Sequence, residues 1–285
     1  MIYRTINLDL QMPDVTLTTY IPEATSEYQE EQKIPAVIIC PGGAYQFLSD
    51  REGEPIALRY NSKGYAAFVL RYRIGMDGQA IQPMPLLDLG RAIVYVKNHA
   101  EEWRIDEKCI SICGFSAGGH LCASYATMWH HSWITEKLKV SKEKLKPCAA
   151  VVGYPVADMI LTEDIRKQEP TKLMNDINVA MFGKVQPEQD ELCKYSPVHQ
   201  VDDLTIPCFI WHTAEDELVD VRNSLHFAEA LYMHRIPFQL HIYPWGKHGL
   251  ALSDRTTDCG EGSVKTDVET WFEAMVTFMG KIQKL

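Results

Sequence analysis

The chain has 285 residues, of which 46% are hydrophobic, and this is enough to bury a large core in one α/β domain. The formal net charge of −10 is not gathered into a long acidic or basic run, which argues against nucleic acids and anionic membrane surfaces as partners. No apolar run approaches the length of a membrane span, and Met1–Gln11 lacks the basic start and apolar stretch of a signal peptide. We therefore expect a single domain over residues 1–285, located in the cytoplasm.

The N-terminal segments predict an antiparallel hairpin. Polar and apolar residues alternate in Ile2–Leu8 and again in Val15–Ile21, as they do in strands with one exposed face. Pro13 and Asp14 between them are typical turn residues.

From Pro35 onward, short apolar runs alternate with longer segments of helical periodicity. The apolar runs are Ala36–Cys40, Tyr65–Leu70, Cys109–Cys113, Ala149–Val152, Cys208–Trp211 and Gln239–Tyr243. The helical segments are Glu52–Lys63, Leu86–Glu102, Ala117–Met128, Val221–His234 and Val264–Ile282. Strands without a polar face, each followed by a helix, predict a mostly parallel central sheet with helices on both faces.

One stretch departs from this rhythm. Residues 155–207 are rich in charge and are interrupted by Pro170, Gly183, Pro187 and Pro197. A long insertion between a strand and the next one is typically a lid or a substrate-binding cap. We therefore expect a cap insertion over 155–207.

The cysteines indicate a reducing compartment and no metal site. Several of the eight cysteines lie inside apolar runs, among them Cys40, Cys109 and Cys113, which favours buried thiols over disulfides. Three residues separate Cys109 from Cys113 on one predicted strand, whereas a zinc knuckle has two, and no other zinc spacing is present. We expect neither a metal nor a cofactor.

The motif Gly114-Phe115-Ser116-Ala117-Gly118 directly follows a predicted strand and directly precedes a predicted helix. A nucleophile elbow holds its serine in a strained turn and needs small residues two positions before and after it. The same segment carries neither a phosphate-loop Lys-Ser/Thr pair nor a dinucleotide-binding glycine pattern. Ser116 is therefore predicted to be a nucleophile in an α/β-hydrolase fold.

A serine nucleophile needs a histidine to take its proton and a carboxylate to orient that histidine. In this fold the order is Ser, Asp or Glu, His, each on a loop after a late strand. His248 lies on such a loop between Lys247 and Gly249, after the predicted strand Gln239–Tyr243. We predict it to be the base.

The acid lies on the loop after Cys208–Trp211, where Glu215, Asp216, Glu217 and Asp220 are close together. We favour Asp216, because its spacing would let Leu218 and Val219 return to the core while the carboxylate faces the histidine. Adjacent charged residues usually face solvent, which is the expectation for Glu215 and Glu217.

Ester cleavage also needs backbone N–H groups for the charge that develops on the carbonyl oxygen. One is predicted to be the amide of Ala117, the residue after the nucleophile. The second should come from the loop after Ala36–Cys40, where either Gly43 or Ala44 would donate.

With these motifs in order, the sequence resembles bacterial carboxylesterases related to acetylxylan esterases, some of which carry a xylanase label. Segments that carry the resemblance are Pro41–Tyr45, Leu48–Pro55, Gly114–His120, Ala214–Val219 and Lys247–Leu250. It departs from the HGGG loop of related lipases, because Pro41 replaces the histidine and Ala44 the third glycine. The resemblance implies hydrolysis of short-chain acyl esters, especially acetyl groups on carbohydrate. Xylanase activity proper does not follow, because glycoside hydrolysis needs two carboxylates and not a triad.

Three further residues are candidates for substrate contact. Tyr45 and Trp245 could form a platform for a sugar ring, although aromatics beside an active site more often wall an acyl pocket. Asp158 could bind a substrate hydroxyl, with a solvated loop carboxylate as the alternative.

We thus expect a serine carboxylesterase whose partner is a small ester, such as an acetylated sugar, and the sequence leaves a homo-oligomer open. Two alternatives are a catalytically silent α/β-hydrolase that binds ligands and a prolyl-type peptidase. A silent protein usually lacks a triad residue, and no N-terminal screening domain of the peptidase kind is present in this sequence.

Overall fold

The computed structural model describes residues 1–24, 33–75 and 80–284. One eight-stranded sheet runs through it in the order β1-β2-β4-β3-β5-β6-β7-β8. The strands are β1 (Ile2–Asn7), β2 (Thr16–Ile21), β3 (Ile34–Cys40), β4 (Ala66–Arg71), β5 (Ile105–Phe115), β6 (Ala150–Gly153), β7 (Cys208–Thr213) and β8 (Phe238–Tyr243). The pairs β1–β2 and β2–β4 are antiparallel, and every pair from β4–β3 to β7–β8 is parallel.

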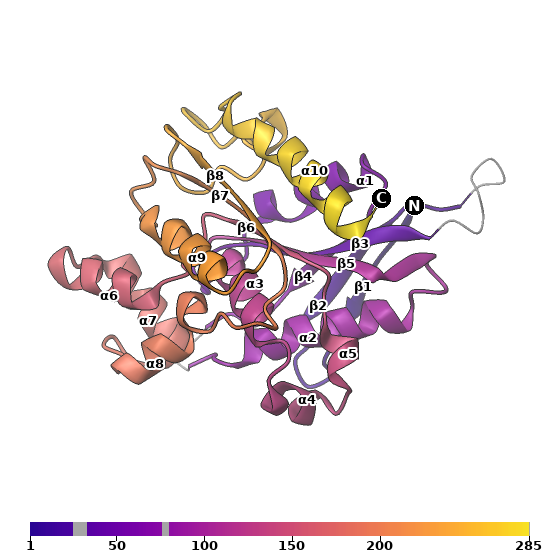
Figure 1. Cartoon of the computed structure of the whole chain (residues 1–285), viewed down its shortest axis with the longest axis horizontal. Coiled ribbons are helices and arrows are strands. Elements are labelled where there is room, and N and C mark those ends of the chain that lie inside the picture. The colour runs from indigo at the N-terminus through magenta and orange to yellow at the C-terminus, as the bar shows by residue number, and fades with distance from the viewer. Residues whose placement is uncertain (25–32, 76–79, 285) are drawn as a thin grey trace.

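Helices cover both faces of the sheet, as the sequence predicted (Figure 1). On one face α1 (Glu54–Asn61) and α10 (Trp271–Gln283) bury residues such as Tyr60 and Trp271. On the other face α2 (Met84–Asn98), α3 (Ala117–Met128) and α9 (Arg222–Met233) bury a larger apolar cluster. The sheet therefore separates two cores, and its carboxyl-end loops are free to carry a site.

The insertion between β6 and β7 contains helices that the interrupted sequence pattern did not predict. They are α6 (Met159–Gln168), α7 (Lys172–Phe182) and α8 (Gln189–Lys194), followed by the short 3-10 helix η2 (Pro197–His199). Figure 1 shows α6, α7 and α8 gathered at one side of the molecule, beyond α9. Pro170 and Pro187 lie between these helices, Gly183 caps the end of α7 and Pro197 is the first residue of η2, so they bound short helices and do not prevent them.

Other short elements complete the described chain: α4 (Ser132–Leu138), α5 (Lys142–Leu145), and the 3-10 helices η1 (Asp50–Glu52), η3 (Arg255–Thr257) and η4 (Val268–Thr270). All eight cysteines lie in the described part, and none of them forms a disulfide. Within that part, no helix is long and apolar enough to cross a membrane, and no cluster of His, Cys, Asp or Glu side chains has the arrangement of a metal site.

Candidate active site

Ser116 occupies a sharp turn between β5 and α3. Its backbone angles are φ 52° and ψ −117°, a conformation that costs energy for any residue with a side chain. The turn brings two backbones into contact, because a Cβ on Gly114 would lie 2.1 Å from the carbonyl oxygen of Gly118, and one on Gly118 would lie 2.0 Å from that of Cys40. Glycine is required at both positions, as the motif predicted, and the strained turn lifts the Ser116 hydroxyl above the sheet edge.

Three predicted residues from distant parts of the chain meet at this edge. The Ser116 Oγ lies 2.8 Å from Nε2 of His248, and Nδ1 of His248 lies 2.6 Å from Oδ2 of Asp216. Ser116 follows β5, Asp216 follows β7 and His248 follows β8, and the carboxyl ends of parallel strands meet at one edge of a sheet. The arrangement can move a proton from the serine to the histidine while the carboxylate holds the imidazole in the required tautomer.

The Asp216 carboxylate is buried, yet its pKa is held below the usual range. Burial by itself raises the pKa of a carboxyl group, but here hydrogen bonds from His212 and His248, together with the backbone amide of Val219, outweigh it. Oδ1 accepts the amides of Leu218 and Val219 at 3.0 and 2.9 Å. Val219 is buried as predicted, whereas Leu218 remains 39% exposed and lines the mouth of the cavity described below.

The neighbouring acidic side chains have other contacts. Glu215 and Glu217 are exposed, and the Glu215 carboxylate accepts the amide of Gly246 at 2.9 Å. Asp220 is paired with the guanidinium of Arg222 at 2.7 Å. Of these four carboxylates, the histidine contacts only that of Asp216 in the described structure.

A second histidine, His212, also contacts the Asp216 carboxylate, and the sequence pattern assigned it no chemical role. It is fully buried at the end of β7, and its Nε2 lies 3.1 Å from Oδ2 of Asp216 and 2.9 Å from the carbonyl oxygen of Val219. Two acceptors around Nε2 require a proton on that nitrogen, so Nδ1 accepts the hydroxyl of Ser224 at 2.8 Å. The available signal was its position four residues before Asp216, on the strand that carries the acid.

The loop predicted to supply oxyanion donors has an unusual backbone. Gly43 has φ 129° and Ala44 has φ 56°, so the chain turns sharply beside Ser116. Within residues 1–24, 33–75 and 80–284, the amides of Gly43, Ala44 and Ala117 have no protein acceptor. Amides left free in this way can stabilise an oxyanion.

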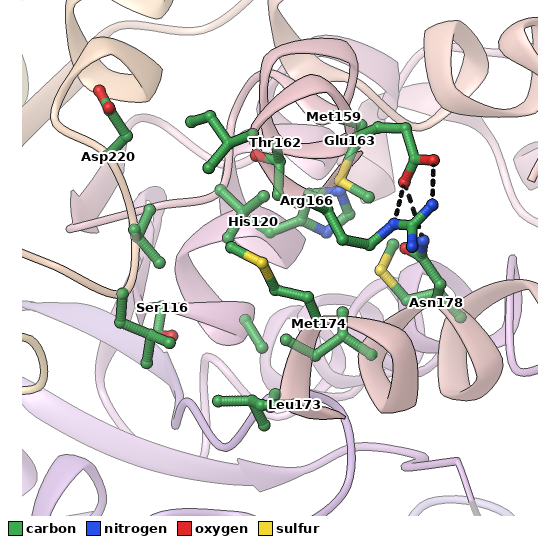
Figure 2. A pocket seen from close by; sticks show the side chains of 18 of the residues that line it. Ser116, His120, Met159, Thr162, Glu163, Arg166, Leu173, Met174, Asn178 and Asp220 are labelled. Carbon is green, nitrogen blue, oxygen red and sulfur yellow. Dashed lines mark hydrogen bonds and ion pairs between the residues drawn. The ribbon is translucent and has the colours of Figure 1, made fainter. Parts of the chain in front are cut away.

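A cavity of about 260 Å³ opens beside Ser116 and extends between α6 and α7. Figure 2 shows Ser116 at one end and the side chains of Met159, Leu173 and Met174 along its walls. Ala44 and Ala117 also line the end at the serine. The cavity is therefore mostly apolar, and Ser116 forms part of its lining.

A charged pair lies in the cavity wall between α6 and α7. Arg166 donates two hydrogen bonds to the Glu163 carboxylate, at 2.7 and 2.6 Å, and Asn178 donates a third at 3.1 Å (Figure 2). Burial raises the pKa of Glu163, but these donors lower it further than burial raises it. The pair is bidentate and neutral overall, and the bond from Asn178 joins it to α7.

None of the three residues predicted to contact substrate presents a free side chain to this cavity. Tyr45 lines the cavity but is 2% exposed, and its hydroxyl bonds Nδ1 of His120 at 2.6 Å, so it is a wall and offers no face for a sugar ring. Trp245 is 64% exposed and does not line this cavity. Asp158 caps α6 through the amides of Ile160 and Leu161 and pairs with His226 at 2.8 Å, so both of its oxygens are occupied.

Comparison with known sequences identifies the family of the chain. The chain matches the BD-FAE family model over residues 20–231. Endo-1,4-beta-xylanase B of Butyrivibrio fibrisolvens is 32% identical over 229 residues, which are 80% of this chain and 34% of that protein. The acetylxylan esterase of Xylanibacter ruminicola is 30% identical over 221 residues, 76% of this chain and 41% of that protein. The chain thus spans between 34% and 41% of the length of these curated relatives.

Solved structures match over nearly their whole length. The carboxylesterase Cest-2923 from Lactobacillus plantarum is 25% identical with a TM-score of 0.84, covering 99% of this chain and 98% of that one. The acetyl ester-xyloside bifunctional hydrolase from Caldicellulosiruptor lactoaceticus is 32% identical with a TM-score of 0.75, covering 96% of each chain. The chain therefore belongs to the BD-FAE family and forms a carboxylic ester hydrolase unit with the α/β-hydrolase fold.

Proposed function

We propose that the chain hydrolyses short-chain acyl esters, acetyl esters among them, through a Ser116–His248–Asp216 triad. The observation that carries the proposal is the unbroken hydrogen-bonded path from the Ser116 hydroxyl through His248 to the buried carboxylate of Asp216. Each contact lies within the range in which a general base can take a proton.

The reaction follows from this path. Ser116 Oγ attacks the ester carbonyl carbon while its proton passes to Nε2 of His248, and the carbonyl oxygen takes the negative charge toward the amides of Ala117 and of Gly43 or Ala44. His248 then gives the proton to the departing alcohol oxygen, leaving an acyl group on Ser116. Water repeats the sequence on this acyl-enzyme and releases the carboxylic acid.

The acyl group is the finer part of the proposal. The names of the acetylxylan esterase and of the acetyl ester-xyloside hydrolase support acetyl, and sugar as the alcohol. The size of the cavity supports acyl groups longer than acetyl as well. An engineered apolar cavity of about 150 Å³ already admits benzene, and this cavity is larger, at about 260 Å³. We propose that residues 155–207, which supply α6 and α7, form the cap that walls this acyl site.

Ser116→Ala tests the function. The variant should lose release of p-nitrophenol from p-nitrophenyl acetate by at least about 1,000-fold, because the nucleophile is gone, and wild type should be labelled by a fluorophosphonate. Ser62→Ala, which removes a hydroxyl at the exposed end of α1, is the matched control and should keep wild-type activity. Undiminished turnover in folded Ser116→Ala would refute the triad, and an unlabelled wild-type serine would favour a silent, ligand-binding protein.

Acetylated xylo-oligosaccharides and aminoacyl-proline amides, assayed side by side, separate an esterase from a prolyl-type peptidase. We expect turnover of the ester only.

A further inference from the structure

Glu52, at the end of η1, is a buried carboxylate that the mechanism above does not use. Its side chain is 3% exposed, and in the described residues it forms no ion pair with Lys, Arg or His. Burying a carboxylate without a cation is costly unless hydrogen bonds compensate. Here Oε2 accepts the amide of Gly42 at 2.7 Å and Oε1 accepts the hydroxyl of Tyr154 at 2.6 Å.

The first of these bonds holds the loop that carries the oxyanion donors. Gly42 is bound on both sides, because its amide donates to Glu52 and its carbonyl oxygen accepts the amide of Ser49 at 2.9 Å. The carbonyl oxygen of Gly43 accepts the amide of Gln46 at 2.9 Å. A trans peptide is planar, and its N–H points opposite to its C=O. Because hydrogen bonds hold the carbonyls of Gly42 and Gly43, the amides of the residues that follow them, Gly43 and Ala44, point to the other side of the loop.

The contact is close enough to constrain the sequence. A Cβ on Gly42 would lie 2.6 Å from Oε2 of Glu52 and 3.0 Å from Cβ of Ser116. The carboxylate, the loop and the nucleophile are therefore packed together with no room between them.

The second bond continues to the loop that carries the base. The Tyr154 hydroxyl donates to Glu52 and accepts the amide of Ala251 at 3.0 Å, while its ring packs edge-on against His248 with centroids 4.9 Å apart. Burial, and then the Glu52 charge, raise the pKa of Tyr154 well above its usual value, so the proton stays on the tyrosine. Arg51, next to Glu52, donates to the carbonyl oxygen of Gly249 at 3.1 Å.

We propose that Glu52 is a positioning residue that holds the oxyanion loop and the histidine loop in register around Ser116. The proposal rests on the proposed function, because it concerns the same transition state. It assigns a role to the conspicuous Leu48–Pro55 segment, which the triad and the oxyanion amides leave unexplained.

The test is kinetic and uses p-nitrophenyl acetate. Glu52→Gln keeps an oxygen for the amide of Gly42 but weakens a charge-assisted hydrogen bond, so kcat should fall about 10-fold. Glu52→Ala removes both hydrogen bonds, so kcat should fall about 100-fold or more, which is the loss typical of one misplaced oxyanion donor. KM should change by less than about threefold, because the loss is confined to the transition state. The matched control is Glu54→Gln, two residues away and exposed, which should retain wild-type kcat.

A transition-state analogue distinguishes positioning from general weakening of the fold. An alkyl boronic acid that adds to Ser116 should lose affinity in Glu52→Gln by the same factor as kcat/KM, while the thermal unfolding midpoint decides whether the fold is intact. If Glu52→Ala does not fold, Glu52→Gln decides. A folded Glu52→Gln with wild-type kcat and boronate affinity would overturn the proposal. Ser116→Ala, assayed in parallel, distinguishes a failure of the proposed function from a failure of the positioning role. If Ser116→Ala remains active, the triad is wrong. If Ser116→Ala is inactive and Glu52→Gln is fully active, only the positioning role is wrong.

Discussion

At the scale of single residues, the acidic loop after β7 shows how burial selects one carboxylate among several. Asp216 is 7% exposed and both of its oxygens receive hydrogen bonds, whereas Glu215 and Glu217 on either side are exposed. A carboxylate can orient and stabilise an imidazolium only where water does not compete for it. His248 contacts Asp216, the residue that the sequence favoured for its spacing to Leu218 and Val219, although only Val219 returns to the core.

Asp216→Asn should lower kcat by about 10,000-fold with little change in KM, because an amide can present N–H to Nδ1 of His248 and so favour the wrong tautomer. Steady-state kinetics on p-nitrophenyl acetate measure this. Glu215→Gln is the control, since it keeps an oxygen for the amide of Gly246. An Asp216→Asn variant within tenfold of wild type would contradict the proposed role.

Two residues at this scale could not be assigned from the sequence. His212 lies in an apolar strand, four residues before Asp216, and Glu52 lies in a charged segment, and the sequence assigned neither of them a role. Their contacts are with Asp216, Gly42 and Tyr154, and the last of these lies 102 positions away from Glu52. The Glu52–Tyr154 pair becomes visible only when distant strands are brought to the same edge.

At the scale of elements, the bounds of a helix were predicted well where residues next to it in the chain set its ends. The predicted helix Ala117–Met128 has the bounds of α3, because the elbow sets its start. The predicted helix Val264–Ile282 begins later, at Trp271, because the Ser253 hydroxyl accepts the amide of Lys265 and the chain then passes through a turn and the 3-10 helix η4. Side-chain contacts from outside an element thus displaced its start.

The cavity between α6 and α7 gives a prediction about acyl length. Met174→Trp should lower kcat/KM for p-nitrophenyl hexanoate by about 10-fold or more while leaving the acetate within about twofold, because filling the cavity removes room for the longer chain only. Lys172→Trp, on an exposed position of the same helix, is the control. A panel of p-nitrophenyl esters from acetate to hexanoate measures the ratio. An equal loss on every ester would mean that the acyl chain does not enter between α6 and α7.

At the scale of the whole molecule, a buried histidine links stability to pH. His120 on α3 accepts the Tyr45 hydroxyl at Nδ1 and donates from Nε2 to the carbonyl oxygen of Tyr195 at 2.7 Å, which ties the sheet core to the insertion. Burial lowers the pKa of His120 to about 4 from the ordinary 6.5. Between these values the unfolded chain binds a proton that the folded chain does not, so stability rises with pH over this window.

Wild type should therefore lose about 3 kcal/mol of unfolding free energy through His120 as the pH falls from 6.5 to about 4. The quantity to measure is the difference in unfolding free energy between wild type and His120→Gln, from denaturant titrations at pH 7.5, 6, 5 and 4. Glutamine can keep both hydrogen bonds without titrating, so the two proteins should converge in stability as the pH falls. Parallel curves over that range would show that His120 is not the group responsible.

By itself, the sequence determined the strands and the helices that alternate with them outside residues 129–207, the strand–turn–helix around Ser116, and the histidine and acid on later loops. These features are local, since hydrophobic period, turn residues and glycine spacing are properties of neighbours along the chain. Helices on both faces of a mostly parallel sheet follow from them.

Only the tertiary structure decided which side chains meet. It removed Tyr45 as a sugar platform and Asp158 as a free ligand by burying the first and using the second as a helix cap. It also formed the apolar cavity from an insertion without a clear pattern and placed Glu52 against Gly42. Cavity size and buried hydrogen bonds depend on packing between segments far apart in the chain, so short-range sequence patterns carry little information about them.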